Sequence, residues 1–225
     1  MTVPVVGPPT RTSRDRRARL LAEFLLVFFG VVGVYQLAGS PGNPIPPLLL
    51  FALGSVWYLR RQPDFDRRAF GRLGGLRGQL PAMLGLWVLA VVVAVVALAV
   101  ISPDRLFQLP RERPLVWAMV TVFYPLFSVY PQELVFRGFL FHRYAPVFGT
   151  GTGIRLASAA AFGFVHIIYG NLLAVVLSTV GGWLFATRYQ RSRSLLVASL
   201  EHALYGLLVF TVGLGEFFYH GAVGR

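Results

Sequence analysis

The chain has 225 residues, of which 56% are hydrophobic and only 13% are charged, and its mean hydropathy is +0.64. So few charged side chains cannot cover a globule of this size in water, so the composition excludes an ordinary soluble domain. All 21 basic residues are arginines, and they cluster at the ends of hydrophobic runs. The net charge of +12 therefore indicates membrane topology and not a nucleic-acid partner. Cysteine is absent, which excludes disulfides and thiolate zinc sites. We predict an all-α polytopic membrane helical bundle with membrane lipids as its surroundings.

The N-terminal region divides into a tail and a first span. Residues 1–19 combine proline, serine and threonine with five arginines, which predicts a disordered basic tail on the cytoplasmic side. The apolar run from Leu20 to Leu37 is too long for the hydrophobic core of a signal peptide and has no clear cleavage site. We expect it to be retained, so that residues 20–225 form one membrane domain.

The hydrophobic runs predict about seven transmembrane helices, since a span needs about 20 residues. Their expected ranges are 20–38, 46–60, 80–101, 114–141, 154–169, 171–188 and 194–214. Arginines are dense in 11–19, 60–77, 137–155 and 188–193, and the segments between hold only Arg105, Arg111, Arg113 and Arg225. The positive-inside rule then predicts a multi-pass cell-membrane protein with a cytoplasmic N-terminus. The exclusive use of arginine is typical of a GC-rich bacterium.

The fourth span contains the first polar motif, Gln132-Glu133-Leu-Val-Phe-Arg137-Gly. Glu133 and Arg137 are four residues apart, so their side chains share one face of a helix. They form either an ion pair that makes two charges tolerable in lipid, or a site in which Arg137 holds an ionised carboxylate that polarises water. Ionisable residues inside a membrane are candidates for function, so both interpretations stay open.

Two histidines follow in later spans. His166 closes Phe162-Gly163-Phe-Val-His, where the small Gly163 would allow a close helix approach. His202 follows Glu201 in Glu-His-Ala-Leu-Tyr-Gly206. Two intramembrane histidines together with the Glu/Arg pair are difficult to explain as packing, and they favour a hydrolytic site.

The ordered motifs resemble those of the CPBP intramembrane proteases, which are Glu-Glu-x-x-x-Arg, Phe-x-x-x-His and His-x-x-x-Asn (or Asp). This family includes the type II CAAX prenyl endopeptidases and bacteriocin-processing or immunity proteins. The resemblance covers residues 112–214, the expected protease-like core, and implies peptide hydrolysis within the membrane. By the resemblance, His166 is the second-motif histidine that helps a glutamate to activate water, His202 stabilises the oxyanion, and Arg137 braces the acidic pair.

The chain departs from the family pattern at two positions. Gln132 stands where the family has the first glutamate, and glutamine cannot take a proton from water. Gly206 stands where the third motif has asparagine, and it offers no side-chain donor. The departures affect the base and the oxyanion donor, the two most demanding parts of the implied mechanism.

Three accounts follow from these departures. In the first, Glu133 itself is the base with His166, after a rotation or unwinding near Pro131. Gln132 then orients water or the substrate carbonyl, and Tyr205 or Asn171 replaces the missing donor. In the second, the chain is a catalytically lapsed relative that acts as a membrane binding or immunity-type partner. In the third, Glu133, His166 and His202 bind zinc, which would make a zinc-dependent membrane peptidase.

The first account is the one we expect, with Glu133, His166, His202, Arg137 and Gln132 as catalytic residues and with no cofactor. The predicted reaction is hydrolysis of a peptide bond in a peptide or protein substrate reached from the membrane. The cavity is expected between the last four spans, open laterally or to the cytoplasm.

Overall fold

The computed structural model describes residues 11–218, and within that range the chain forms helices and no strand. In chain order the helices are α1 (Arg11–Leu25), η1 (Leu26–Gly30), α2 (Val31–Leu37), α3 (Ile45–Arg61), η2 (Arg67–Phe70), α4 (Leu76–Ile101), η3 (Pro103–Arg105), α5 (Gln108–Glu112), α6 (Pro114–Tyr124), η4 (Pro125–Val129), α7 (Tyr130–Glu133), η5 (Leu134–Phe139), α8 (Leu140–Arg143), α9 (Ala145–Phe148), α10 (Thr152–Val165), η6 (His166–Tyr169), α11 (Leu172–Ser192), α12 (Leu195–Val212) and η7 (Gly215–Phe218).

Six helices of the described range are long and apolar enough to cross a membrane. They are Arg14–Leu37, Leu76–Ile101, Pro114–Arg143, Thr152–Tyr169, Leu172–Ser192 and Leu195–Val212. The polytopic helical bundle is therefore confirmed. Helix α3 lies where the second span was expected, but with 17 residues it is shorter than these six. The count of seven stays a prediction.

The N-terminal helix begins earlier than the sequence suggested. Residues 11–19 are helical and continue into α1, so this part of the tail is ordered and the prediction of disorder was wrong for it. The first ten residues of the predicted tail lie outside the described part of the chain. Arginines are compatible with a helix because their long side chains lose little rotamer freedom there.

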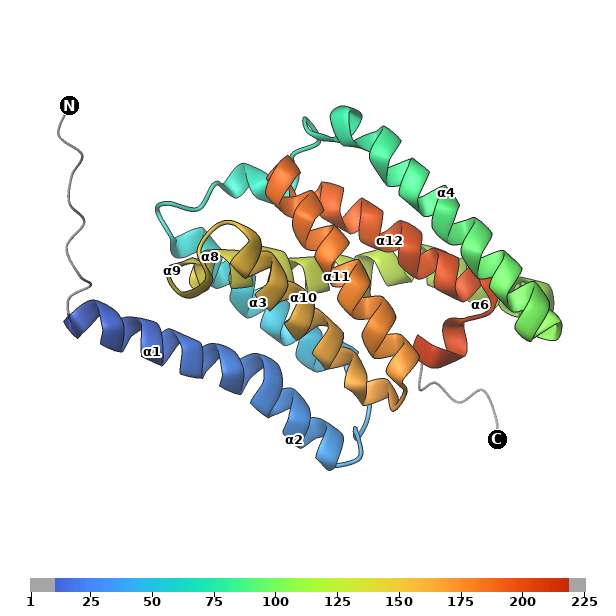
Figure 1. The fold of residues 1–225 in the computed structure, drawn as a ribbon, viewed down its shortest axis with the longest axis horizontal. Helices are drawn as coiled ribbons and strands as arrows, with labels where there is room; N and C mark the ends of the chain where they lie inside the picture. Colours follow the sequence, from blue (N-terminus) through green and yellow to red (C-terminus); the bar gives the residue numbers. More distant parts are fainter. Residues whose placement is uncertain (1–10, 219–225) are drawn as a thin grey trace.

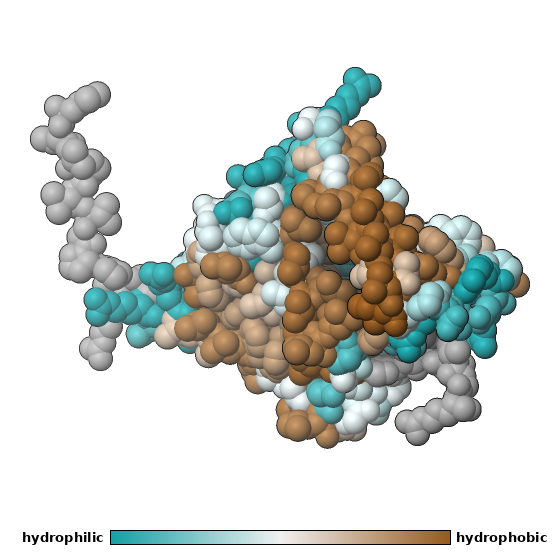
Figure 2. All heavy atoms as spheres, turned by 45° about the vertical axis from the view of Figure 1, so that its right-hand side comes forward, coloured by the Kyte–Doolittle hydropathy of each residue, from teal (hydrophilic) through white to brown (hydrophobic). Residues whose placement is uncertain are grey.

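Helix α4 packs against α12 (Figure 1), and most of the apolar side chains of α4 are exposed. Its solvent-exposed residues include Leu84, Val88, Val92 and Val96. Figure 2 shows hydrophobic side chains over the middle of this face and hydrophilic ones toward its ends. That distribution is the one a protein surrounded by lipid requires.

Helices α10 and α11 lie side by side and approach closely through glycines (Figure 1). A Cβ on Gly163 would overlap the side chain of Thr179, and one on Gly182 would lie 3.1 Å from Ala159 Cα. The expectation that Gly163 permits a close helix contact is confirmed. The contact places α11 directly beside the helix that carries His166.

The helix that carries the first motif is a continuous rod from α6 to α8 with two widened, π-helical segments, η4 and η5. Pro125 and Pro131 lack the N–H that a regular helical turn needs, and both lie in or beside these segments. π-type turns inside α-helices recur at functional sites. Local unwinding near Pro131, which the sequence suggested, is therefore present.

Candidate active site

The two neighbouring residues of the first motif face different surroundings. Glu133 is fully buried, whereas Gln132 is partly exposed and lines a pocket. Adjacent side chains on a helix diverge by about 100°, so one helix can serve both environments. The unwinding near Pro131 does not bring Glu133 to the pocket. The structure thus separates a buried ionic cluster from a mostly apolar pocket that Gln132 lines.

The buried cluster is centred on Glu133. Its Oε1 atom lies 3.1 Å from Arg137 Nη1 and 2.9 Å from His202 Nδ1. Arg137 also donates from Nη2 to the carbonyl of Gly182 at 3.0 Å, and its guanidinium lies 4.5 Å from the ring centroid of Phe162. Arg137 and Glu133 are both 0% exposed, so each charge is held by protein groups alone. The interpretation that Arg137 holds an ionised carboxylate fits this geometry.

His202 links Glu133 to a tyrosine. A carboxylate can only accept, so the proton on His202 lies on Nδ1, and Nε2 is left as an acceptor. The hydroxyl of Tyr124 lies 3.4 Å from Nε2, at the long limit of a hydrogen bond. The imidazole is stacked on Phe185 with centroids 4.5 Å apart and an interplanar angle of 12°. Glu133, His202 and Tyr124 therefore form a continuous row of polar contacts inside the bundle.

Tyr124 also explains the second departure from the family pattern. A Cβ on Gly206 would overlap the ring and hydroxyl of Tyr124. The missing side chain in α12 is thus replaced in space by a phenol from α6. The hydroxyl of Tyr124 is both a donor and an acceptor. It therefore supplies, beside His202, the polar group that the third motif carries four residues after its histidine.

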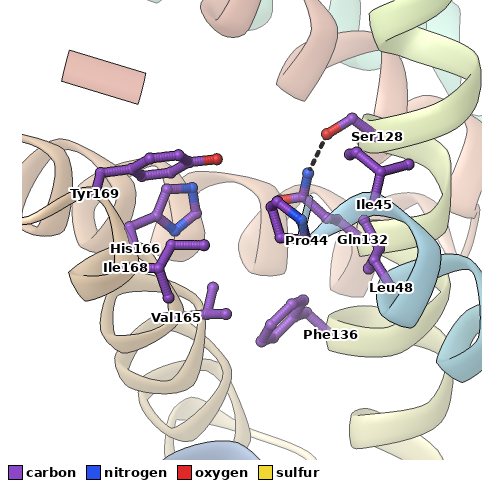
Figure 3. A pocket seen from close by; sticks show the side chains of 10 residues that line it. All are labelled: Pro44, Ile45, Leu48, Ser128, Gln132, Phe136, Val165, His166, Ile168 and Tyr169. Carbon is purple, nitrogen blue, oxygen red and sulfur yellow. Dashed lines mark hydrogen bonds between the residues drawn. The ribbon is translucent and has the colours of Figure 1, made fainter. Parts of the chain in front are cut away.

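The pocket lies between α3, the middle of the long helix and η6, and has a volume of about 90 Å³. Gln132 and Ser128 lie on one wall and His166 and Tyr169 on the opposite wall (Figure 3). The amide of Gln132 donates to Ser128 Oγ at 2.7 Å, which leaves its carbonyl oxygen as an acceptor. Since one water takes about 30 Å³ in the liquid, the pocket has room for a few waters.

The orientation of His166 is fixed by its own helix. Its Nδ1 atom lies 2.7 Å from the carbonyl oxygen of Phe162, and a carbonyl only accepts. Nδ1 therefore carries the proton, and Nε2 holds the lone pair of the neutral ring. A neutral imidazole nitrogen that borders a water-sized space is the arrangement that a general base needs.

The five expected catalytic residues therefore fall into two groups. Glu133, Arg137 and His202 meet in the buried cluster, and Gln132 and His166 meet across the pocket. Within residues 11–218, Glu133 makes no hydrogen bond to His166. The expected cavity between the last four spans is not the one observed, because α3 forms a wall and α11 and α12 do not.

The alternative ligand set for zinc is not gathered in one place. In the described part of the chain, no three histidine, aspartate or glutamate side chains are arranged to hold a metal ion. His166 lies on the pocket, while Glu133 and His202 bind each other directly. The residues present therefore do not fit the three-ligand zinc site.

Three other residues considered from the sequence have different roles. The Glu201 side chain is not the hydrogen-bond partner of His202 but accepts two hydrogen bonds from Arg188, each at 2.8 Å. Asn171 caps α11 through the N–H of Ala174 and donates to Phe217 O, so its side chain is engaged away from the oxyanion position. Tyr205 packs against Phe185, 6.0 Å between ring centroids.

Tyr124 and Ser128 are the polar groups at the site that the motifs did not identify. A signal was present, because residues 124, 128 and 132 are spaced by four and form a polar stripe along one helix. Tyrosine and serine are common in ordinary helix packing, so the stripe alone does not indicate a functional site. It does so only together with His202 beside Tyr124 and Gln132 beside Ser128.

A comparison with known protein families matches the part of the chain that contains this site. Residues 113–208 match the model of the family described as Type II CAAX prenyl endopeptidase Rce1-like. The resemblance to the CPBP family is thereby confirmed. The matched segment contains all three motifs and Tyr124, and leaves α1 to α4 outside. No curated protein and no solved structure matches the chain. The match supports an intramembrane endopeptidase at the family level.

Proposed function

We propose that the chain is an intramembrane endopeptidase that hydrolyses a peptide bond of a membrane-associated substrate. The observation that carries the proposal is that Gln132 and His166, from two of the three family motifs, face each other across one pocket. The Rce1-like match supports the reaction class. We further propose that the protein resides in the cell membrane of a bacterium, with a cytoplasmic N-terminus, lipids and substrate peptide as partners, and no cofactor.

In this mechanism His166 is the general base. Nε2 of the neutral ring takes a proton from a water in the pocket, while the Gln132 carbonyl accepts the second hydrogen of that water and orients it. The oxygen attacks the peptide carbonyl, and the imidazolium then gives its proton to the leaving amine. General acid–base catalysis of this kind contributes about 100-fold to 10,000-fold.

The developing oxyanion needs a donor in the pocket. Ser128 accepts the Gln132 amide and keeps its own O–H proton, so it is the nearest candidate. His202 was expected in this role, but both of its nitrogens are engaged by Glu133 and Tyr124. We therefore propose that Glu133, Arg137 and His202 position the long helix, and thereby Gln132 and Ser128, against η6.

One observation favours a second candidate, a lapsed protease that binds a peptide without cleaving it. The residue that faces His166 is an amide in place of the acid that the family carries, and an amide has no basic form. This candidate keeps the same pocket and the same ligand class, as in a binding or immunity-type partner.

Cleavage of apolar peptides by the purified protein in liposomes separates these candidates. The endopeptidase predicts activity in the unaltered protein, a loss of about 100-fold or more in His166→Ala, and no effect of a chelator. Activity that appears only in Gln132→Glu would instead establish the lapsed protease. Loss of activity with the chelator, restored by zinc, would contradict the cofactor-free mechanism.

A further inference from the structure

The pocket lies toward one end of the bundle. Its walls include Pro44 and Ile45, where α3 begins, and Tyr169, where the helix of His166 ends. The Asn171 side chain donates to Phe217 O, and the backbone N–H of Phe107 donates to Val212 O. The segments 38–44, 102–113, 170–171 and 213–218 therefore gather at this same end.

The other end of the bundle is closed by aromatic packing. Phe136 forms the floor of the pocket, and Leu140 and Tyr144 follow on the same face of the long helix. These three side chains are at most 4% exposed. Phe28 packs on Phe136 with ring centroids 5.5 Å apart, and Phe24 packs on Tyr144 at 5.3 Å. A peptide from that end would have to displace the core.

The closed end is the arginine-rich end. Exposed arginines surround it at the end of α3, between α3 and α4, in the first turn of α4 and where α11 ends, namely Arg60, Arg61, Arg67, Arg68, Arg77, Arg191 and Arg193. Within residues 11–218 the pocket end carries only Arg105, Arg111 and Arg113. By the positive-inside rule the closed end faces the cytoplasm.

We infer that the pocket takes its peptide from the non-cytoplasmic side of the membrane. The substrate is then a segment of an exported or membrane-anchored protein near the outer surface, and not a cytoplasmic chain terminus. None of the residues that line the pocket is an acid or an arginine, so the segment is apolar or neutral. The inference rests on the proposed orientation and on peptide binding in this pocket, and it differs from the expectation of a lateral or cytoplasmic opening.

The absence of cysteine makes this inference directly testable, because a single introduced thiol is the only one in the chain. The test positions are Ile45→Cys in the pocket wall, Pro41→Cys in the exposed 38–44 segment, and Arg61→Cys at the closed end. Val96→Cys on the exposed face of α4 controls for a thiol in lipid. A charged, membrane-impermeant maleimide is added to right-side-out or inside-out vesicles, and each variant is first checked for an unchanged thermal midpoint.

The expected result is that Ile45→Cys and Pro41→Cys react in right-side-out vesicles, Arg61→Cys reacts only in inside-out vesicles, and Val96→Cys reacts in neither. An added apolar peptide slows labelling at position 45 but not at 41. If Pro41→Cys reacts only in inside-out vesicles and Arg61→Cys reacts in right-side-out vesicles, the orientation is overturned. If Pro41→Cys reacts in right-side-out vesicles while Ile45→Cys does not react, or reacts only in inside-out vesicles, the access route is overturned. Because no step requires cleavage, either failure is distinct from a failure of the proposed activity.

Discussion

At the scale of single residues, the site depends on the different surroundings of two neighbouring side chains, Gln132 and Glu133. The Gln132 amide lines the pocket, where a neutral group does not need a fixed partner of opposite charge. The carboxylate is inside, where Arg137 and His202 compensate its charge. A buried carboxylate with two such partners stabilises a fixed geometry, and removing it leaves a cation without its counter-ion.

Replacement of Glu133 by glutamine is therefore expected to act mainly on stability. The change leaves Arg137 buried without a negative partner, which costs about 3–5 kcal/mol for a broken buried pair. Denaturant titration in detergent micelles measures the loss. The double variant Glu133→Gln, Arg137→Met removes the orphaned charge and should recover part of it. A double variant less stable than the single one would contradict the account of the ion pair.

The close contact at Gly206 gives a second expectation. Gly206→Ala places a Cβ on Tyr124, so the thermal midpoint falls, although alanine is the better helix former elsewhere. Gly85→Ala in α4 is the matched control, because no atom lies within 4 Å of its Cβ position, and it should be neutral or slightly stabilising. Adding Tyr124→Leu should relieve the Gly206→Ala defect. Equal midpoints for the two alanine variants would argue against the packing described.

At the scale of elements, a second buried polar cluster joins three helices. Arg188 of α11 forms a two-pronged ion pair with Glu201 of α12 and donates to the side chain of Gln79 in α4 at 2.8 Å. Both charged residues are at most 5% exposed. Since α4 otherwise presents apolar side chains outward, this polar contact helps to fix its place against α12.

Breaking this cluster is expected to loosen the bundle without touching the pocket. Glu201→Leu leaves the Arg188 guanidinium unpaired and destabilises by about 3–5 kcal/mol, whereas Glu201→Leu with Arg188→Met should lose much less. Peptide cleavage per folded molecule should stay close to that of the unaltered protein in the double variant. A double variant that is stable but inactive would show that Arg188 or Glu201 serves the reaction.

The sequence predicted the elements well and their mutual contacts only in part. Continuous apolar runs place the helices within a few residues, because a span is defined by composition and length. The spacing of Glu133 and Arg137 predicted their ion pair, and Gly163 predicted the close contact of α10 with α11.

Contacts between distant segments were beyond the sequence. Glu201 and His202 are adjacent in the sequence, yet their side chains diverge and Glu201 pairs with Arg188. Tyr124 fills the space beside Gly206 from another helix, and no local pattern contains that fact. The inclusion of α3 in the pocket wall likewise follows from how the helices pack.

At the scale of the whole molecule, the bundle is asymmetric along its axis. One end is arginine-rich and filled by phenylalanine, tyrosine and leucine, and the other carries a mostly apolar pocket with a few polar groups, which reaches the middle of the long helix. An asymmetric bundle of this kind keeps water at the reacting groups while the rest of the core stays dry. The reaction proposed for the pocket therefore depends on His166 and Gln132 and only indirectly on the buried ions.

The most direct test of the central claim compares the turnover of His166→Ala with that of Glu133→Gln, each expressed per folded molecule in liposomes. If His166 is the base, His166→Ala loses about 100-fold or more, while Glu133→Gln loses far less once its folded fraction is counted. The reverse order, with Glu133→Gln inactive although folded and His166→Ala active, would contradict the account and make Glu133 the base.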